Sequence, residues 1–311
     1  MARTNFNDLL DAGVHFGHLK RKWNPNMAPY IFMERNGIHI IDLYKTMAKI
    51  DEAAAALKQI SKSGKKVLFV ATKKQAKEIV AQHVRRVNMP YVTERWPGGM
   101  LTNFSTIRKA VRKMSSLDKM IKSPVFKNMS KRERLQISRE KTKLEKQLGS
   151  IVDLNRLPSA LFVVDICKEH IAIAEARKLN IPTFAIVDTN SNPNEVDFPI
   201  PSNDDASKAI DLIVGIMIDA IEEGLGERKV DKEKRLIEEE HDEEFEDKTI
   251  LEPSFEEFEE EEEVTPGLIG RKPILEVGPQ KMKEMPAEEP GRAKRPRRVI
   301  SKSTKKPISR K

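Results

Sequence analysis

Two loops combine clustered cations with a tryptophan, a set of side chains suited to binding nucleic acid. The first contains Lys20-Arg21-Lys22-Trp23-Asn24-Pro25-Asn26, and the second contains Arg95-Trp96-Pro97-Gly98-Gly99. Lysine and arginine contact phosphates, an indole can stack on an unpaired base, and adjacent glycines let a partner approach the backbone. The competing interpretations are packing for Trp23 and a tight turn for the glycines. We predict RNA contacts at Lys20, Arg21, Lys22, Trp23, Asn24, Asn26, Arg95, Trp96, Gly98 and Gly99.

Further basic residues follow a strand and recur along a helix. Two consecutive lysines come directly after the first clearly apolar strand, and three cations share the start of a helix. Point charges in these places suit an extended phosphate backbone. The alternative for the helix is an ordinary solvated face. The additional predicted RNA contacts are Lys73, Lys74, Asn103, Arg108, Lys109 and Arg112.

Carboxylates and histidines give weaker signals for catalysis or metal binding. Asp165 and Asp188 each follow an apolar strand, where a parallel α/β sheet would place a catalytic acid or a metal ligand. Such a site needs a third partner, which the sequence does not reveal, and the other interpretation is that both aspartates shape turns. His15 and His18 lack a second pair of metal ligands. We predict no catalytic residue, no metal and no cofactor.

The turn after the first apolar strand does not resemble a nucleotide cradle. It reads Thr72-Lys73-Lys74-Gln75, and the chain contains neither GxGxxG nor GxxxxGK nor GxSxG. A small-molecule substrate is therefore not expected. An α/β nucleotide or sugar-phosphate enzyme that uses Asp165 and Asp188 is the alternative hypothesis.

Strands that alternate with helices must position these residues. The apolar runs Val67–Ala71, Ala160–Val164 and Thr183–Val187 are typical of buried parallel strands, and shorter strands are expected at Ile38–Ile41 and Tyr91–Thr93. Helices are expected over 5–12, 46–62, about 76–87, 169–179 and 206–221, with Gly64 ending the second. This rhythm predicts an α/β fold with a mainly parallel, Rossmann- or flavodoxin-like sheet.

The segment 103–152 breaks that rhythm. Apolar residues recur every three or four positions, Ser123-Pro124 ends one helix, and a capping box at Ser130–Glu133 opens the next. We predict an inserted, antiparallel coiled-coil hairpin whose outer faces are basic.

The charge of the chain is divided into three blocks. Residues 1–230 carry a net charge of +12, residues 231–263 carry −14, and residues 264–311 carry +10, which together give +8. The basic body favours a polyanionic partner, whereas blocks of like charge cannot bury a core. We therefore expect a folded domain over 1–229, an acidic segment over 230–263 and a basic, Pro-rich tail over 264–311, with regular structure ending near Gly226. The single Cys167 excludes a disulfide framework, and we expect neither a secretory signal nor a membrane-spanning run.

Several ordered motifs resemble the bacterial form of one ribosomal family. They are Gly17–Met27, Pro29–Phe32, Gly37–Leu43, Phe69–Ala76, Arg95–Phe104, Pro158–Asp165 and Asn180–Pro182. Together they resemble the second small-subunit ribosomal protein, the S-two family, over about residues 1–229.

The resemblance implies a non-catalytic component of translation and of subunit assembly. In this family, the α/β domain and its hairpin lie between the head and body of the small subunit, in the cytoplasm, with no membrane or small-molecule substrate. The implied partners are 16S rRNA and neighbouring ribosomal proteins, including the large mRNA-binding first protein. A non-ribosomal RNA-binding regulator is the other alternative. For the tail, the hypothesis is that the acidic block meets a basic ribosomal protein and the basic end meets rRNA.

Overall fold

The computed structural model describes residues 3–250, apart from the side chains of residues 125, 127 and 235–250. The basic tail 264–311, and the acidic segment from residue 251 onward, therefore lie outside the described residues. Within the described range, no helix is both long and apolar enough to span a bilayer.

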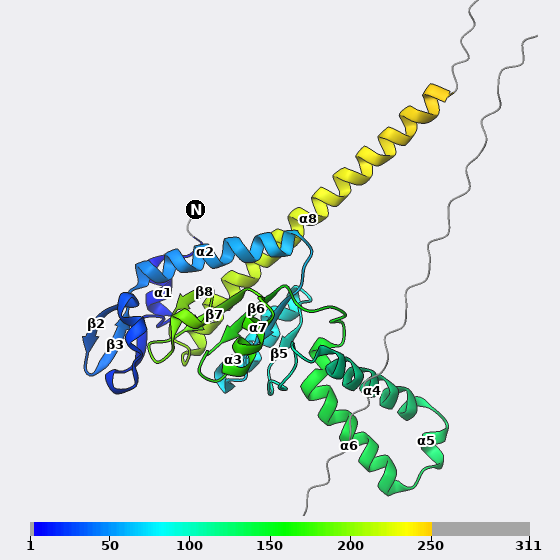
Figure 1. The fold of residues 1–311 in the computed structure, drawn as a ribbon, viewed down its shortest axis with the longest axis horizontal. Coiled ribbons are helices and arrows are strands. Elements are labelled where there is room, and N and C mark those ends of the chain that lie inside the picture. The colour runs from blue at the N-terminus through cyan, green and yellow to red at the C-terminus, as the bar shows by residue number, and fades with distance from the viewer. Residues whose placement is uncertain (1–2, 251–311) are drawn as a thin grey trace, which may run out of the picture. The chain divides into compact units, whose positions relative to one another are not determined.

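A five-stranded parallel sheet forms the centre of the fold (Figure 1). Its strands are β4 (Val67–Val70), β5 (Tyr91–Val92), β6 (Ala160–Val164), β7 (Thr183–Val187) and β8 (Phe198–Pro201). Their spatial order is β5-β4-β6-β7-β8, and each neighbouring pair is parallel. Counted from the first of these strands, this is the 2-1-3-4-5 order of flavodoxin-like folds. The predicted α/β fold class is confirmed.

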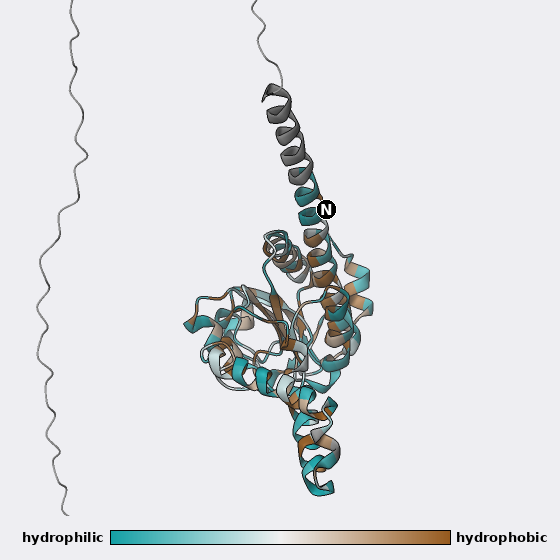
Figure 2. Cartoon of the chain, turned by 90° about the vertical axis from the view of Figure 1, so that its right-hand side faces the viewer, coloured by the Kyte–Doolittle hydropathy of each residue, from teal (hydrophilic) through white to brown (hydrophobic). Residues whose placement is uncertain are grey.

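Helices cover both faces of the sheet, because its central strands are apolar on both sides. The first face is covered by α2 (Leu43–Lys62), α3 (Lys74–Arg86) and α8 (Ser207–Ile250). Phe69, Phe162 and Phe184 are fully buried there. The second face is covered by α7 (His170–Lys178) and by the base of the hairpin. Figure 2 shows the hydrophobic residues concentrated between these layers.

The N-terminal segment folds into a second, antiparallel sheet that the sequence analysis only partly predicted. After α1 (Phe6–Asp11), the chain forms β1 (Phe16–Leu19), the 3-10 turns η1 (Lys20–Lys22) and η2 (Pro25–Tyr30), β2 (Ile31–Arg35) and β3 (Ile38–Ile41). The sheet order is β1-β3-β2. Asn36 and Gly37 both have positive φ, of 53° and 74°, which is the geometry of a tight hairpin turn. This sheet presents the first basic loop.

The predicted hairpin is present and leaves the body as two helices that lie side by side (Figure 1). It contains α4 (Phe104–Lys122), α5 (Val125–Asn128), α6 (Lys131–Leu148) and η3 (Gly149–Ile151). Ser130 and Glu133 form the capping box that opens α6. Asp118 of α4 pairs with Lys141 of α6 at 2.6 Å. Hydrogen bonds from Lys122 and Lys141 lower the pKa of Asp118 to about 2.

The expectation that regular structure ends near Gly226 is wrong. The helix expected over 206–221 is α8, which continues to Ile250 and includes the first part of the acidic segment. A single glycine within a helix costs only about 1 kcal/mol, and glutamate and lysine are good helix formers. High charge excludes a buried core here, but it does not exclude a helix.

Candidate RNA-contacting surface

The loop between β5 and α4 is built around one buried carboxylate. Oε1 of Glu175, on α7, accepts hydrogen bonds from the indole Nε1 of Trp96 at 3.2 Å and from the amide of Gly99 at 2.7 Å. Oε2 accepts from the amides of Leu101 at 3.0 Å and Thr102 at 3.2 Å. Burial raises the pKa of Glu175, but the backbone hydrogen bonds outweigh this effect, so the pKa lies below its ordinary value. The network fixes the conformation of the loop.

The burial of Trp96 argues against its predicted contact with RNA. Its side chain is only 6% exposed and its one donor is occupied, so the ring has no free face for a base. Arg95, Gly98 and Asn103 around it are exposed. Gly99 has a φ of 84°, so its role is a turn, whereas a Cβ at Gly98 would have no atom within 4 Å. The open part of this loop is therefore Arg95, Gly98 and Asn103.

The first basic loop is anchored to the loop that follows β7. The backbone amide of Asn24 donates to the carbonyl of Thr189 at 2.8 Å, and Nδ2 of Asn26 donates to Oδ1 of Asn192 at 3.0 Å. The side chain of Asn24 caps η2, because its oxygen accepts from the amide of Asn26. Trp23 is 36% exposed, and its ring centroid lies 5.1 Å from that of His39. The exposed side chains of this loop are Lys20, Arg21, Lys22, Trp23 and Asn26.

Lys73 is buried and ion-paired, which argues against its predicted contact with RNA. Its side chain is 7% exposed, and Nζ lies 2.8 Å from Oδ1 of Asp204 and 2.6 Å from Oδ1 of Asp205. Burial alone would lower its pKa, but these hydrogen bonds outweigh burial and raise the pKa above its ordinary value. A lysine that is itself buried and is held by two carboxylates is poorly placed to reach a phosphate. The neighbouring Lys74 is exposed and remains a candidate.

The cluster around Lys73 fills the crevice in which flavodoxin-like folds hold ligands. That crevice lies beyond β4 and β6, where the strand order reverses. Thr72 donates a hydrogen bond to Glu169 there, and Lys73 lies 3.8 Å from Asp165. Asp165 has a φ of 71° and accepts a hydrogen bond from the amide of Lys168, so it shapes the turn after β6. Protein side chains occupy the place that a nucleotide would need.

A second carboxylate, Asp204, completes a group with His18 and Asp188 that the sequence did not reveal. Nδ1 of His18 lies 2.9 Å from Oδ2 of Asp188, and ligand atoms of His18, Asp188 and Asp204 lie within 4.8 Å of one another. Oδ2 of Asp204 is buried and has no hydrogen-bond partner among the described residues. Burial, together with the charge of Asp188, raises the pKa of Asp204 to about 7. One imidazole nitrogen and two carboxylate oxygens could hold a divalent cation such as Zn²⁺.

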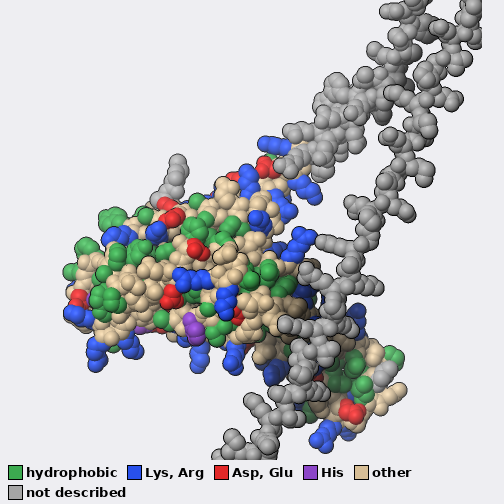
Figure 3. All heavy atoms as spheres, viewed as in Figure 1, with side chains coloured by type: hydrophobic (Ala, Val, Ile, Leu, Met, Phe, Trp, Pro, Cys, Tyr) green, Lys and Arg blue, Asp and Glu red, His purple; other side chains and the backbone are tan. Residues whose placement is uncertain are grey.

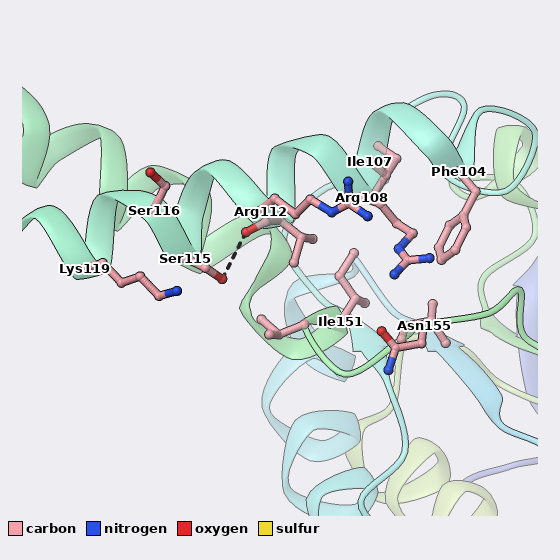
Figure 4. Close-up of a pocket in the computed structure, with 12 residues that line it drawn as sticks. Phe104, Ile107, Arg108, Arg112, Ser115, Ser116, Lys119, Ile151 and Asn155 are labelled. Carbon is pink, nitrogen blue, oxygen red and sulfur yellow. Dashed lines mark hydrogen bonds between the residues drawn. The ribbon is translucent and has the colours of Figure 1, made fainter.

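The base of the hairpin forms a groove with an apolar floor and a basic rim (Figure 4). The groove has a volume of about 450 Å³. Phe104, Ile107 and Ile151 contribute to its floor, and Arg108 and Arg112 point from α4 toward the opening. Arg112 and Lys109 are exposed, and Arg108 is half-buried. These three predicted cations therefore share one end of the hairpin.

An apolar surface near the N-terminus was not predicted as a site. A hollow of about 290 Å³ lies between α1, β2, β3 and the start of α2. Phe32 and Tyr44, which line it, are 70% and 72% exposed. Large exposed aromatic side chains in one patch are typical of a protein interface.

Comparison with known proteins agrees with this architecture. The family model described as ribosomal protein S2 matches residues 9–224. The chain is 68% identical over 232 residues to the small ribosomal subunit protein uS2 of Parabacteroides distasonis, covering 75% of this chain and 84% of that protein. The proteins of the same name from Phocaeicola vulgatus and Flavobacterium johnsoniae are 70% and 68% identical over the same share of this chain, covering 83% and 91% of those proteins. The chain therefore belongs to the ribosomal protein S2 family.

Proposed function

We propose that the chain is a structural constituent of the small ribosomal subunit that binds 16S rRNA and neighbouring ribosomal proteins and catalyses no reaction. The observation that carries this proposal is the family match over residues 9–224, together with relatives named as small-subunit proteins. The filled crevice at Lys73 and Asp165 supports it, because an enzyme of this fold would keep that place open. The α/β enzyme hypothesis is not favoured.

Sedimentation tests the assignment to the ribosome. The full chain, produced with an affinity tag in a bacterium of the same group as the relatives above, should co-migrate with the small subunit in a sucrose gradient. Contacts to phosphates weaken steeply with salt, so high salt should release it. Most of the protein at the top of the gradient at low salt would contradict the proposal and favour a free RNA-binding regulator.

Among the cations predicted to bind RNA, those exposed on the surface are proposed to contact 16S rRNA. The set comprises Lys20, Arg21, Lys22, Lys74, Arg95, Lys109 and Arg112, with Arg108 half-exposed beside them. Removing one phosphate contact lowers the slope of log affinity against log salt by roughly 0.7–0.9. Arg21→Gln, Lys22→Gln and Arg95→Gln combined should therefore reduce the slope for purified 16S rRNA by about 2. An unchanged slope would show that these loops do not contact the rRNA.

The apolar hollow is proposed as the contact for a protein neighbour. Phe32 and Tyr44 offer aromatic surface, and no Lys or Arg is among the residues that line the hollow. Such a surface suits a protein partner better than RNA. The resemblance to the S-two family names the large mRNA-binding first protein as the candidate. Phe32→Ala with Tyr44→Ala should reduce the amount of that protein on purified small subunits while leaving this chain in place. An unchanged amount would exclude the hollow as its contact.

The proposed location is the ribosome in the bacterial cytoplasm. For residues 230–311, the proposal is that the acidic block meets a basic ribosomal protein and the basic end meets rRNA. A chain that lacks Asp231–Lys311 should then assemble into small subunits with altered protein composition or an altered rRNA footprint. If both stay unchanged, the tail has no such role.

A further inference from the structure

Four hollows of the surface adjoin one another from the hairpin to α8. The groove at the hairpin base shares Leu154 with a small hollow beside the start of β5. That hollow shares Lys66 and Asn88 with a groove of about 760 Å³ beneath α8. This groove in turn shares Arg228 and Lys232 with a hollow of about 580 Å³ between α2 and α8. Because neighbouring hollows share lining residues, the four lie next to one another along one side of the surface, here called the track, and the hollow that links its two ends is only about 20 Å³.

The track runs along the edge of the sheet opposite the two predicted loops. Lys66 directly precedes β4, and Asn88 lies three positions before the start of β5, so both lie at the amino ends of parallel strands. Lys74 and Arg95 follow the same two strands at their carboxyl ends. The track is therefore a separate surface from the loops, although it begins at the hairpin.

Both ends of the track are basic. At the hairpin end, the cations that line it are Arg108, Arg112 and Lys119, here called the hairpin cations. At the other end they are Arg228, Lys229 and Lys232, here called the α8 cations. Lys66 lies between the two ends. Figure 3 shows Lys and Arg side chains gathered where α8 leaves the body.

The α8 cations remain available because the acids of α8 between residues 222 and 231 pair with the body, and the exposed Glu233 forms no ion pair with these cations among the described side chains. Glu223 pairs with Arg3 at 2.7 Å, and Glu227 pairs with Lys58 at 2.7 Å. The two other acids between 222 and 231 pair likewise, Glu222 with Arg86 and Asp231 with Lys62. Among residues whose side chains the structure describes, none forms an ion pair with an α8 cation. The carboxylates thus hold α8 to the body, while three charges stay open to a partner.

Gly64 makes room for one of the α8 cations, Arg228. It has a φ of 75°, and a Cβ at this position would collide with the guanidinium of Arg228. The guanidinium therefore lies directly over the turn between α2 and β4. This packing holds the cation at the boundary between the two hollows instead of leaving it on a free side chain.

We propose that the backbone of one RNA segment lies along this track, bound by the hairpin cations at one end and the α8 cations at the other. The inference rests on the proposed function and adds a second RNA-binding edge to it. An RNA partner is favoured over a protein because the α8 end is rimmed by cations and has no exposed aromatic anchor among its lining residues. At the hairpin end, the half-buried Phe104 can stack on a base.

Charge-neutral variants of the full chain test the track. In the test variant, Arg228→Gln, Lys229→Gln and Lys232→Gln are combined. In the matched control, Lys168→Gln, Lys178→Gln and Lys208→Gln are combined, because these lysines are exposed and line none of the four hollows. Both variants lose three positive charges. Binding of each to purified 16S rRNA is measured by filter retention over a series of salt concentrations.

The expected result is a salt slope smaller by about 2 in the α8 variant than in the control variant, since each lost phosphate contact removes roughly 0.7–0.9. Equal slopes in the two variants, with wild-type binding intact, would overturn the track and leave the proposed function standing. Failure of the wild-type chain to bind 16S rRNA would instead contradict the proposed function. Equal melting temperatures by circular dichroism confirm that both variants are folded; should the α8 variant melt lower, Lys229→Gln alone is compared with Lys178→Gln.

Discussion

The carboxylate of Glu175 and the indole of Trp96 are joined by a buried hydrogen bond of 3.2 Å, although the two residues lie 79 positions apart. The same carboxylate binds the backbone of the glycine-containing loop at Gly99, Leu101 and Thr102. A single side chain on α7 therefore shapes the loop that presents Arg95 and Asn103. The buried tryptophan fixes the shape of this loop, and its burial argues against a direct contact with RNA.

Replacement of Glu175 by alanine should destabilise the protein strongly. Each buried donor left without an acceptor costs about 1–3 kcal/mol, and several donors lose their acceptor at once. We expect the free energy of unfolding in urea to fall by about 3 kcal/mol or more. Glu78→Ala, at an exposed position on α3, is the control and should change it by less than about 0.5 kcal/mol. A loss below about 1 kcal/mol for Glu175→Ala would show that water replaces the carboxylate.

The same carboxylate should make stability depend on pH. The pKa of Glu175 is lower in the folded chain than its ordinary value, so the folded state binds this proton more weakly than the unfolded state. Its contribution is complete above the unfolded pKa and is lost as pH falls through the folded pKa. The stability difference between wild type and Glu175→Gln should therefore shrink between about pH 7 and about pH 3, a range that brackets the ordinary glutamate pKa. A difference that stays constant would assign the effect to packing.

The fold could be predicted where a short apolar run fixes a buried strand. β4, β6 and β7 are buried at every position, so their sequences differ clearly from the polar segments around them. β8 was missed because Pro199 and Pro201 argue against a strand. The structure accommodates them because β8 is an edge strand, which needs donors on one side only. The pair Asn36-Gly37 is typical of a two-residue hairpin turn, and it could have predicted the turn between β2 and β3.

The candidate site was harder to predict, because sequence shows residue types but not their long-range partners. Lys73 and Trp96 are residue types that commonly bind RNA, yet Asp204 and Glu175 hold them inside the protein. These partners lie 131 and 79 residues further along the chain. The cations of the hairpin and of the first loop stay on the surface because no acid is folded against most of them. The exceptions among the described residues are Lys20, which pairs with Glu34 at 2.6 Å, and the hairpin residues Lys113, Lys122 and Lys141, which pair with Glu140 or Asp118.

Two glycines of α8 should respond in opposite ways to alanine. A Cβ at Gly224 would lie 2.5 Å from the carbonyl oxygen of Lys58, so Gly224→Ala must push α8 away from α2. We expect a loss of about 1–3 kcal/mol in the free energy of unfolding, as for other overpacked positions. A Cβ at Gly226 meets nothing within 4 Å. Gly226→Ala should therefore gain up to about 1 kcal/mol from helix propensity.

Urea unfolding followed by circular dichroism distinguishes these two outcomes. The pair is a matched test, because both variants add one methyl group to the same helix, two residues apart. Equal effects of the two substitutions would mean that the contact between α2 and α8 is loose enough to absorb a methyl group.

The group formed by His18, Asp188 and Asp204 should respond to zinc. A cation would supply the partner that Oδ2 of Asp204 lacks among the described residues and would offset the repulsion between the two aspartates. Zinc at about 100 times its dissociation constant would stabilise the folded chain by about 2.7 kcal/mol. For a domain of this size, that corresponds to a rise of about 5–10 °C in melting temperature.

The measurement is thermal unfolding of the RNA-free chain with and without Zn²⁺. Asp204→Asn should remove most of the shift, because a neutral amide is a poor zinc ligand. Asp8→Asn, an exposed position on α1, is the control and should keep the full shift. An equal shift in wild type and Asp204→Asn would place any bound zinc elsewhere. The three side chains would then act only through their hydrogen bonds, by which Asp188 holds the ring of His18 against the loop after β7.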